Sequence, residues 1–152
     1  MKRYGMKKKK QVRAVIDTNL FVSGFFADQG FTCEIQELWL AGVFELAVSK
    51  KILQEITNTL LKPYIRDRLR IEESEVTNII SLISEKAFII TEDRYVTDAI
   101  TADHSDNKFL ACALEAGADY IVSGDNHLLA LKHFHGIQIV NAKSFVETVK
   151  TK

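Results

Sequence analysis

Four acidic residues lie beside apolar segments of the chain, far apart in sequence, where their side chains could act together. They are Asp17, Glu55, Asp106 and Asp125. Crowded carboxylates repel one another unless a cation holds them together, and Mg²⁺ or Mn²⁺ prefers such oxygen ligands. A cation of this kind also retains waters that can serve as a nucleophile. The four acids therefore predict a hydrolytic metal site that acts on a phosphoester.

Two of the acids follow short apolar runs that are typical of buried strands. Asp17 follows residues 14–16, and Asp125 follows residues 121–123 across the single Gly124. Open α/β sheets bind ligands outside the carboxyl ends of their strands. If the two strands are parallel, both carboxylates project at the same edge of the sheet.

The other two acids belong to segments with helical periodicity. Asp106 is in phase with Phe109 and Leu110, so it is expected to face inward at the start of a helix, where the helix dipole favours its charge. Glu55 is in phase with Ile52 and Ile56 and borders the buried stripe of its helix. A half-buried acid of this kind needs a partner.

Each acid also has a plainer interpretation when it is considered alone. Asp106 is then an ordinary first-turn helix residue, Asp125 a turn residue, and Asp17 the acceptor of an Asx-turn at a strand end. Glu55 is then a surface acid. The four plain interpretations do not explain why two strand ends, one helix start and one half-buried helical position all carry acids.

Elements that must position these acids alternate between strands and helices. Strands are expected at 12–17, 44–48, 87–90, 120–123 and 137–140. Helices are expected at 20–27, 31–42, 50–61, 74–85, 106–116, 126–131 and 142–149, with Ser49 as the cap of the third and Pro63 preventing its continuation. Strands separated by helical crossovers predict a mainly parallel sheet that is covered on both faces.

Composition and charge fit one globular domain whose body is acidic. The 152 residues are 47% hydrophobic and carry no formal net charge. Six lysines and arginines fall in the first ten residues, which contain no acid, so residues 11–152 carry a charge of −6. Nucleic acid would therefore be held by local basic patches. The candidates are the N-terminal tail and the group Lys62, Arg66, Arg68 and Arg70, although a solvated tail and helix end explain each equally well.

Other residue types suggest no second kind of site. Cys33 and Cys112 lie far apart without metal-ligand spacing, and both are expected to be reduced core residues. No apolar stretch approaches the roughly 20 residues that cross a bilayer, so a cytoplasmic protein without membrane contact is expected. We expect the four histidines, His104, His127, His133 and His135, to lie outside the catalytic set.

Three blocks of sequence resemble the PIN-domain ribonucleases, particularly the branch formed by the toxins of toxin-antitoxin pairs. The blocks are residues 15–19 with 21–23, residues 49–60 around Glu55, and residues 106–113 continuing through 117–125. The last block is the most specific. The resemblance covers nearly the whole chain, from Val12 to about Val149.

The resemblance implies a three-layer α/β/α nuclease domain over residues 11–150, with a mainly parallel central sheet, preceded by a basic flexible tail over residues 1–10. It also implies that the four acids coordinate Mg²⁺ or Mn²⁺, and that water bound to the metal attacks an RNA phosphodiester. Thr18, Asn19 and Ser123 would orient the carboxylates, with Asp103 as an outer acid. An RNA substrate, an antitoxin protein and a homodimer are the implied partners.

One departure from the family pattern leaves alternatives open. The segment before the helix of Asp106 is usually richer in acids than residues 103–107 are here. Fewer acids imply a weaker second metal and permit a catalytically weak PIN-like module that binds RNA or protein. A third hypothesis is an aspartyl-phosphate phosphatase or receiver-type domain, but such enzymes usually need a second acid where this chain has Asn19.

Overall fold

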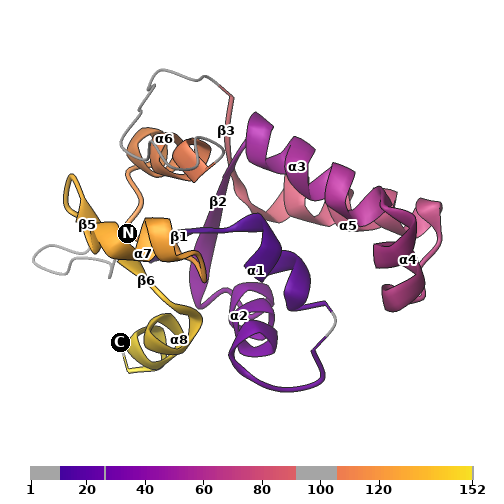
Figure 1. Ribbon diagram of the computed structural model, residues 1–152, viewed down its shortest axis with the longest axis horizontal. Coiled ribbons are helices and arrows are strands. Elements are labelled where there is room, and N and C mark those ends of the chain that lie inside the picture. Colours follow the sequence, from indigo (N-terminus) through magenta and orange to yellow (C-terminus); the bar gives the residue numbers. More distant parts are fainter. Residues whose placement is uncertain (1–10, 26, 92–105, 152) are drawn as a thin grey trace, which may run out of the picture.

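A six-stranded sheet is the centre of the protein in the computed structural model, which describes residues 11–25, 27–91 and 106–151 (Figure 1). In the order β3-β2-β1-β4-β6-β5, all neighbouring strands are parallel except the β5–β6 pair. The strands are β1 (Val12–Ile16), β2 (Phe44–Ser49), β3 (Phe88–Ile90), β4 (Tyr120–Val122), β5 (His133–Phe134) and β6 (Ile137–Val140). The predicted mainly parallel sheet is confirmed. The tail predicted at residues 1–10 lies outside the described residues.

Helices cover both faces of this sheet. Figure 1 shows α6 on one side of the sheet and α2 with α8 on the other, while α3, α4 and α5 extend to one end. The helices are α1 (Thr18–Ser23), α2 (Phe31–Leu40), α3 (Lys50–Leu61), α4 (Pro63–Leu69), α5 (Glu73–Lys86), α6 (Asn107–Ala116), α7 (Asn126–Leu131) and α8 (Ala142–Lys150). Successive side chains of a strand point to opposite faces, and both Ala14 and Val15 are fully buried in β1, so both faces are covered. None of the described helices is long and apolar enough to cross a membrane.

Three elements differ from the sequence-based expectation. Helix α1 begins at Thr18 because the side chain of Asp17 caps it, and it ends at Ser23 instead of continuing to residue 27. Helix α4 follows directly after α3, because Pro63 ends one helix and is well suited to begin the next. Strand β5 is an unexpected two-residue strand, joined to β6 by a tight turn at His135 and Gly136, both with positive φ.

Aromatic rings pack helices against one another and against the sheet. Phe21 of α1 meets Trp39 of α2 edge-on at 5.6 Å, and Phe44 of β2 meets Phe145 of α8 at 5.0 Å. Cys112 is buried, as expected. The prediction that Cys33 is a core residue is wrong: it is half-buried on α2, and its hydrogen bond to Glu37 raises the pKa of its thiol.

The strand order creates one topological switch point. From β1 the chain moves outward to β2 and β3, and it then returns to the other side of β1 to form β4 and β6. Loops that leave β1 and β4 therefore diverge, and in open α/β sheets a crevice at such a point is the usual ligand site. Asp17 and Asp125 follow these two strands.

Gly24 controls how closely α1 approaches α2. A Cβ atom at this position would lie 2.5 Å from Cγ of Gln36 and 2.8 Å from the carbonyl oxygen of Thr32. The side chain of Gln36 is buried, and its Nε2 donates to the carbonyl oxygen of Phe21, so it has little room to move. We predict that Gly24→Ala lowers the free energy of unfolding by about 1 to 3 kcal/mol in chemical denaturation.

The matched control is Gly124→Ala, where an added Cβ meets nothing within 4 Å. This variant should stay within about 0.5 kcal/mol of the parent protein. Equal stability of the two variants would show that the α1–α2 contact tolerates a wider spacing.

Candidate metal centre

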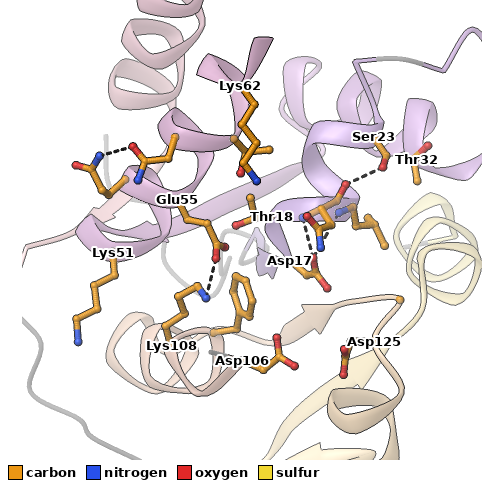
Figure 2. A pocket seen from close by; sticks show the side chains of 17 residues that line it. Asp17, Thr18, Ser23, Thr32, Lys51, Glu55, Lys62, Asp106, Lys108 and Asp125 are labelled. Atoms are coloured by element: carbon orange, nitrogen blue, oxygen red, sulfur yellow. Dashed lines mark hydrogen bonds and ion pairs between the residues drawn. The ribbon is translucent and has the colours of Figure 1, made fainter. Parts of the chain in front are cut away.

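All four predicted acids line one pocket at the carboxyl edge of the sheet. The pocket has a volume of about 870 Å³ and lies at the switch point between β1 and β4. Figure 2 shows the carboxylates of Asp17, Asp106 and Asp125 around a common space, with Glu55 further toward α3. The structure therefore brings together residues that are up to 108 positions apart in the sequence.

Asp17 is fixed by the end of β1 and the beginning of α1. Its backbone N–H donates to the carbonyl oxygen of Val122 at 2.9 Å, which continues the β1–β4 pairing by one residue. Its Oδ1 accepts from the N–H groups of Asn19 at 2.9 Å and Leu20 at 3.4 Å. These bonds satisfy donors at the helix start and orient the carboxylate.

Ser123 joins the ends of the two strands. Its fully buried hydroxyl donates to Oδ2 of Asp17 at 2.6 Å and accepts from the backbone N–H of Asp125 at 2.9 Å. One side chain thus sets the carboxylate of the first acid and the backbone of the last. The hydrogen bond to Asp17 is the contact through which Ser123 would orient a carboxylate.

Asp125 repeats at β4 the arrangement of Asp17 at β1. Its Oδ1 accepts from the N–H groups of His127 at 2.8 Å and Leu128 at 3.3 Å, so it caps α7. The plain interpretations, an Asx-turn acceptor for Asp17 and a turn residue for Asp125, therefore describe one carboxylate oxygen of each. Because a carboxylate has two oxygens with about four acceptor positions, capping does not prevent either from binding a cation.

Asp106 precedes α6 and is buried, with 8% of its surface exposed. Its side chain does not cap its own helix. Its carboxylate forms a group with Asp125 and His127 in which one potential ligand atom from each lies within 4.8 Å of the others. Ligands about 2.1 Å from one ion lie roughly 3 to 4.2 Å apart, so a small inward movement would suffice for coordination.

His127, which was expected to lie outside the catalytic set, is a candidate ligand. Its Nδ1 lies 3.7 Å from Oδ1 of Asp125, and its side chain is 54% exposed. The available signal was its position in the first turn of α7, two residues after an acid at a strand end.

Glu55 has a basic partner that was not anticipated. Nζ of Lys108 lies 2.9 Å from Oε2 of Glu55, and only 16% of the lysine side chain is exposed. Lys108 is in the first turn of α6, two residues after Asp106, and its ammonium also lies 4.8 Å from the ring centre of Phe109. The half-buried acid of α3 is therefore neutralised by α6.

The donor chemistry of the pocket fits a hard divalent cation. Its lining contains the four acids and three lysines, Lys51, Lys62 and Lys108, which leaves a formal charge of −1. Carboxylate oxygens dominate, and the described lining offers no thiolate. This donor set suits Mg²⁺ or Mn²⁺ better than a soft metal.

The remaining predicted residues divide between those in the pocket and those away from it. Thr18 and Asn19 both line the pocket, and Oγ1 of the buried Thr18 has no hydrogen-bond partner among the described residues. Asp103 lies outside the described residues. Of the four basic candidates, Lys62 lines the pocket, whereas Arg66, Arg68 and Arg70 belong to α4 and its end and do not.

Removing the Ser123 hydroxyl tests the link between the two strand ends. We predict that Ser123→Ala lowers the free energy of unfolding by about 1 to 3 kcal/mol, because the part-buried N–H of Asp125 loses its acceptor. Calorimetric titration should also show Mn²⁺ affinity about 10- to 100-fold weaker. Ser84→Ala, at an exposed position of α5, should change neither quantity. Unchanged metal affinity in the Ser123 variant would show that the hydroxyl serves the fold alone.

Comparisons with known proteins place the chain in a family. A family model described as the PIN domain matches residues 13–127. An uncharacterized protein of Methanocaldococcus jannaschii, MJ1680, is 31% identical over 124 residues, which cover 82% of this chain and 77% of that protein. Among solved structures, the PIN domain of human SMG5 is similar with a TM-score of 0.47 and 13% identity, over 90% of this chain and 97% of that one.

The predicted resemblance to PIN domains is thus confirmed, while the toxin role stays a prediction. PIN domains form a family of nucleases that are typically metal-dependent, and the acidic pocket is a possible metal site. Because the family model matches most of the chain, and the archaeal relative is similar over most of its own length, this protein belongs to the PIN-domain family.

Proposed function

We propose that this protein is a Mg²⁺- or Mn²⁺-dependent endoribonuclease that hydrolyses RNA phosphodiester bonds. One observation carries the proposal: the carboxylates of Asp17, Asp106 and Asp125, from three separate parts of the chain, surround one pocket at the switch point of the sheet. Membership of a nuclease family supports it. The likeness of individual blocks to toxins supports RNA as the substrate.

The three aspartates are the residues that would hold the cation. Asp17 and Asp125 are oriented before any ligand arrives, because strand ends and helix caps fix them. A divalent cation in this place supplies Lewis-acid polarisation of a phosphate oxygen and a site for activating water. Glu55, at the side of the pocket nearest α3, completes the ligand set or accepts the proton of the attacking water.

The finer parts of the proposal concern partners. We propose that the protein acts as the toxin of a toxin-antitoxin pair, with an antitoxin protein that restrains it, and that two copies form a homodimer. The support is the likeness of residues 15–23 and 106–125 to that branch. Copurification with the product of a small adjacent reading frame tests the pairing.

One observation favours a second candidate, a PIN-like module that binds RNA or protein without cutting. Lys108 already neutralises Glu55, so one of the four acids is engaged by an ammonium group of the chain itself. A module of this kind would bind nucleic acid and release no cleaved product.

Loss of cleavage on removing single carboxylates tests the proposed reaction. We predict that Asp17→Asn and Asp125→Asn each reduce Mn²⁺-dependent cleavage of a labelled RNA by more than about 100-fold. Loss of a residue that only supports a metal ligand typically reduces activity by up to about 100-fold, and loss of a ligand should cost more. Each change keeps the size of the side chain and removes its charge. Glu147→Gln, on the exposed face of α8, is the matched control and should cleave at the parent rate.

Chelation of the metal should abolish the same activity in the parent protein. Binding of RNA without any cleavage, in the presence of Mg²⁺ or Mn²⁺, would instead support the non-cutting module. Cleavage that survives both aspartate substitutions would contradict the assignment of the site.

Replacing Lys108 tests the balance of charge in the pocket. We predict that Lys108→Met strengthens Mn²⁺ binding about tenfold in calorimetric titration, because the variant loses a positive charge that repels the cation, a repulsion of about 1 to 4 kcal/mol for two unit charges roughly 4 Å apart. Lys143→Met, at an exposed position of α8, should leave the affinity unchanged. Weaker binding by the Lys108 variant would show that the lysine orients Glu55 for coordination.

A further inference from the structure

Two hydroxyl groups on the helices show how such a group is commonly satisfied in this protein. That of Ser23 donates to the carbonyl oxygen of Asn19 at 2.7 Å, and that of Thr57 donates to the carbonyl oxygen of Leu53 at 2.8 Å. Each acceptor belongs to the preceding turn, four residues earlier. Thr18 is the first residue of α1, so no turn of its own helix precedes it.

The hydroxyl of Thr18 lies in the wall of the acidic pocket without such an acceptor. Only 2% of the residue's surface is exposed, and Oγ1 has no hydrogen-bond partner among the described residues. The hydroxyl of Ser123, by comparison, bonds the carboxylate of Asp17 and the backbone of Asp125. A buried hydroxyl without a partner costs free energy of folding, which a valine of similar shape would avoid. The hydroxyl of Thr18 is therefore placed to bond a group that enters the pocket.

We propose that the Thr18 hydroxyl, together with the carboxylate of Glu55, holds the water molecule that attacks the phosphodiester. This inference rests on the proposed function, and it adds a residue that contacts the reacting water. Figure 2 shows Thr18 between Glu55 and Asp17, and helices α1 and α3, which carry Thr18 and Glu55, pack against each other. The water would thus bridge the start of α1 and the middle of α3.

The charges around the hydroxyl favour water over a phosphate oxygen at this point. Asp17 and Glu55 flank Thr18 in Figure 2, and their carboxylates would both repel an anionic oxygen. Neutral water can instead donate one hydrogen to Glu55 and accept from the hydroxyl. Nζ of Lys108 lies 2.9 Å from Oε2 of Glu55, and a carboxylate has two oxygens, so Oε1 can accept from the water.

The attack on phosphorus balances within this arrangement. As the water oxygen forms a bond to phosphorus, one of its protons passes to Glu55, and the bond between phosphorus and the leaving ribose oxygen breaks. The leaving oxygen takes up a proton from solvent, and Glu55 later returns its proton to solvent. The Thr18 hydroxyl makes and breaks no covalent bond. It fixes the water in the position from which attack is possible.

Kinetic measurements on Thr18→Val test this role. The variant keeps the β-branched shape and removes the hydroxyl, so kcat for a labelled RNA in Mn²⁺ should fall by about 100-fold. KM and the calorimetric Mn²⁺ affinity should stay unchanged. The melting temperature should not fall, because no hydrogen bond to a described residue is lost. Thr18→Ser, which restores the hydroxyl, should retain most of the parent kcat.

The matched control is Thr57→Val, whose hydroxyl does have a partner and does not line the pocket. This variant should keep the parent kcat. A crystal structure of the full-length parent protein with Mn²⁺ gives a readout that does not require cleavage. It should show a water within about 3 Å of both Oγ1 of Thr18 and a carboxylate oxygen of Glu55, and the structure of Thr18→Val should lack this water.

Full kcat in Thr18→Val, failure of Thr18→Ser to restore the rate, or a raised KM with unchanged kcat would overturn the inference. So would a lower melting temperature together with weaker Mn²⁺ binding, which would assign the hydroxyl to the fold or to a carboxylate. If the bridging water is present but the parent protein never cuts RNA, the water site stands and the proposed nuclease fails. Cutting by the parent protein at a rate that Thr18→Val preserves does the reverse.

Discussion

The site depends on one buried hydroxyl group that joins two neighbouring parallel strands. Ser123 donates to the carboxylate of Asp17 after β1 and accepts from the backbone of Asp125 after β4. Parallel pairing places both strand ends at one edge, and the reversal of strand order opens a crevice between the loops that follow them. The hydroxyl fixes the carboxylate of Asp17 relative to the backbone of Asp125 at this edge.

Charge is balanced by the same elements that supply the acids. Asp106 directly precedes helix α6, and Lys108 in the first turn of this helix pairs with Glu55 of α3. The short helices α1 and α7 each take an aspartate as their cap, so their backbone N–H groups hold the carboxylates in place. Like charges can therefore share a pocket in the folded protein, and a net attraction for cations remains.

Much of the fold and the core of the site could be predicted because their signals are local. An acid directly after a strand, as at Asp17 and Asp125, is visible in the sequence, and parallel pairing then determines where it points. Periodicity likewise assigned Asp106 to the start of a helix. That helix ends at residue 116, as expected, and the residue after it is Gly117 at φ +61°, a left-handed conformation that strongly favours glycine.

Features that depend on contacts between distant elements could not be predicted in this way. The Glu55–Lys108 pair joins α3 to α6, and no pattern within either helix specifies the other. The proximity of His127 to Asp106 follows from packing at the switch point. The arginines after Pro63 form a basic run in the sequence, but α4 places them outside the pocket that Lys62 lines.

Anomalous diffraction from crystals of this protein soaked in Mn²⁺ tests most directly whether the acids form a metal centre. From the proposed function, we expect a manganese peak within coordination distance of the carboxylates of Asp17, Asp106 and Asp125, at about 2.1 Å. Mn²⁺ bound elsewhere at saturation, with these three side chains ordered and no peak between them, would contradict the account.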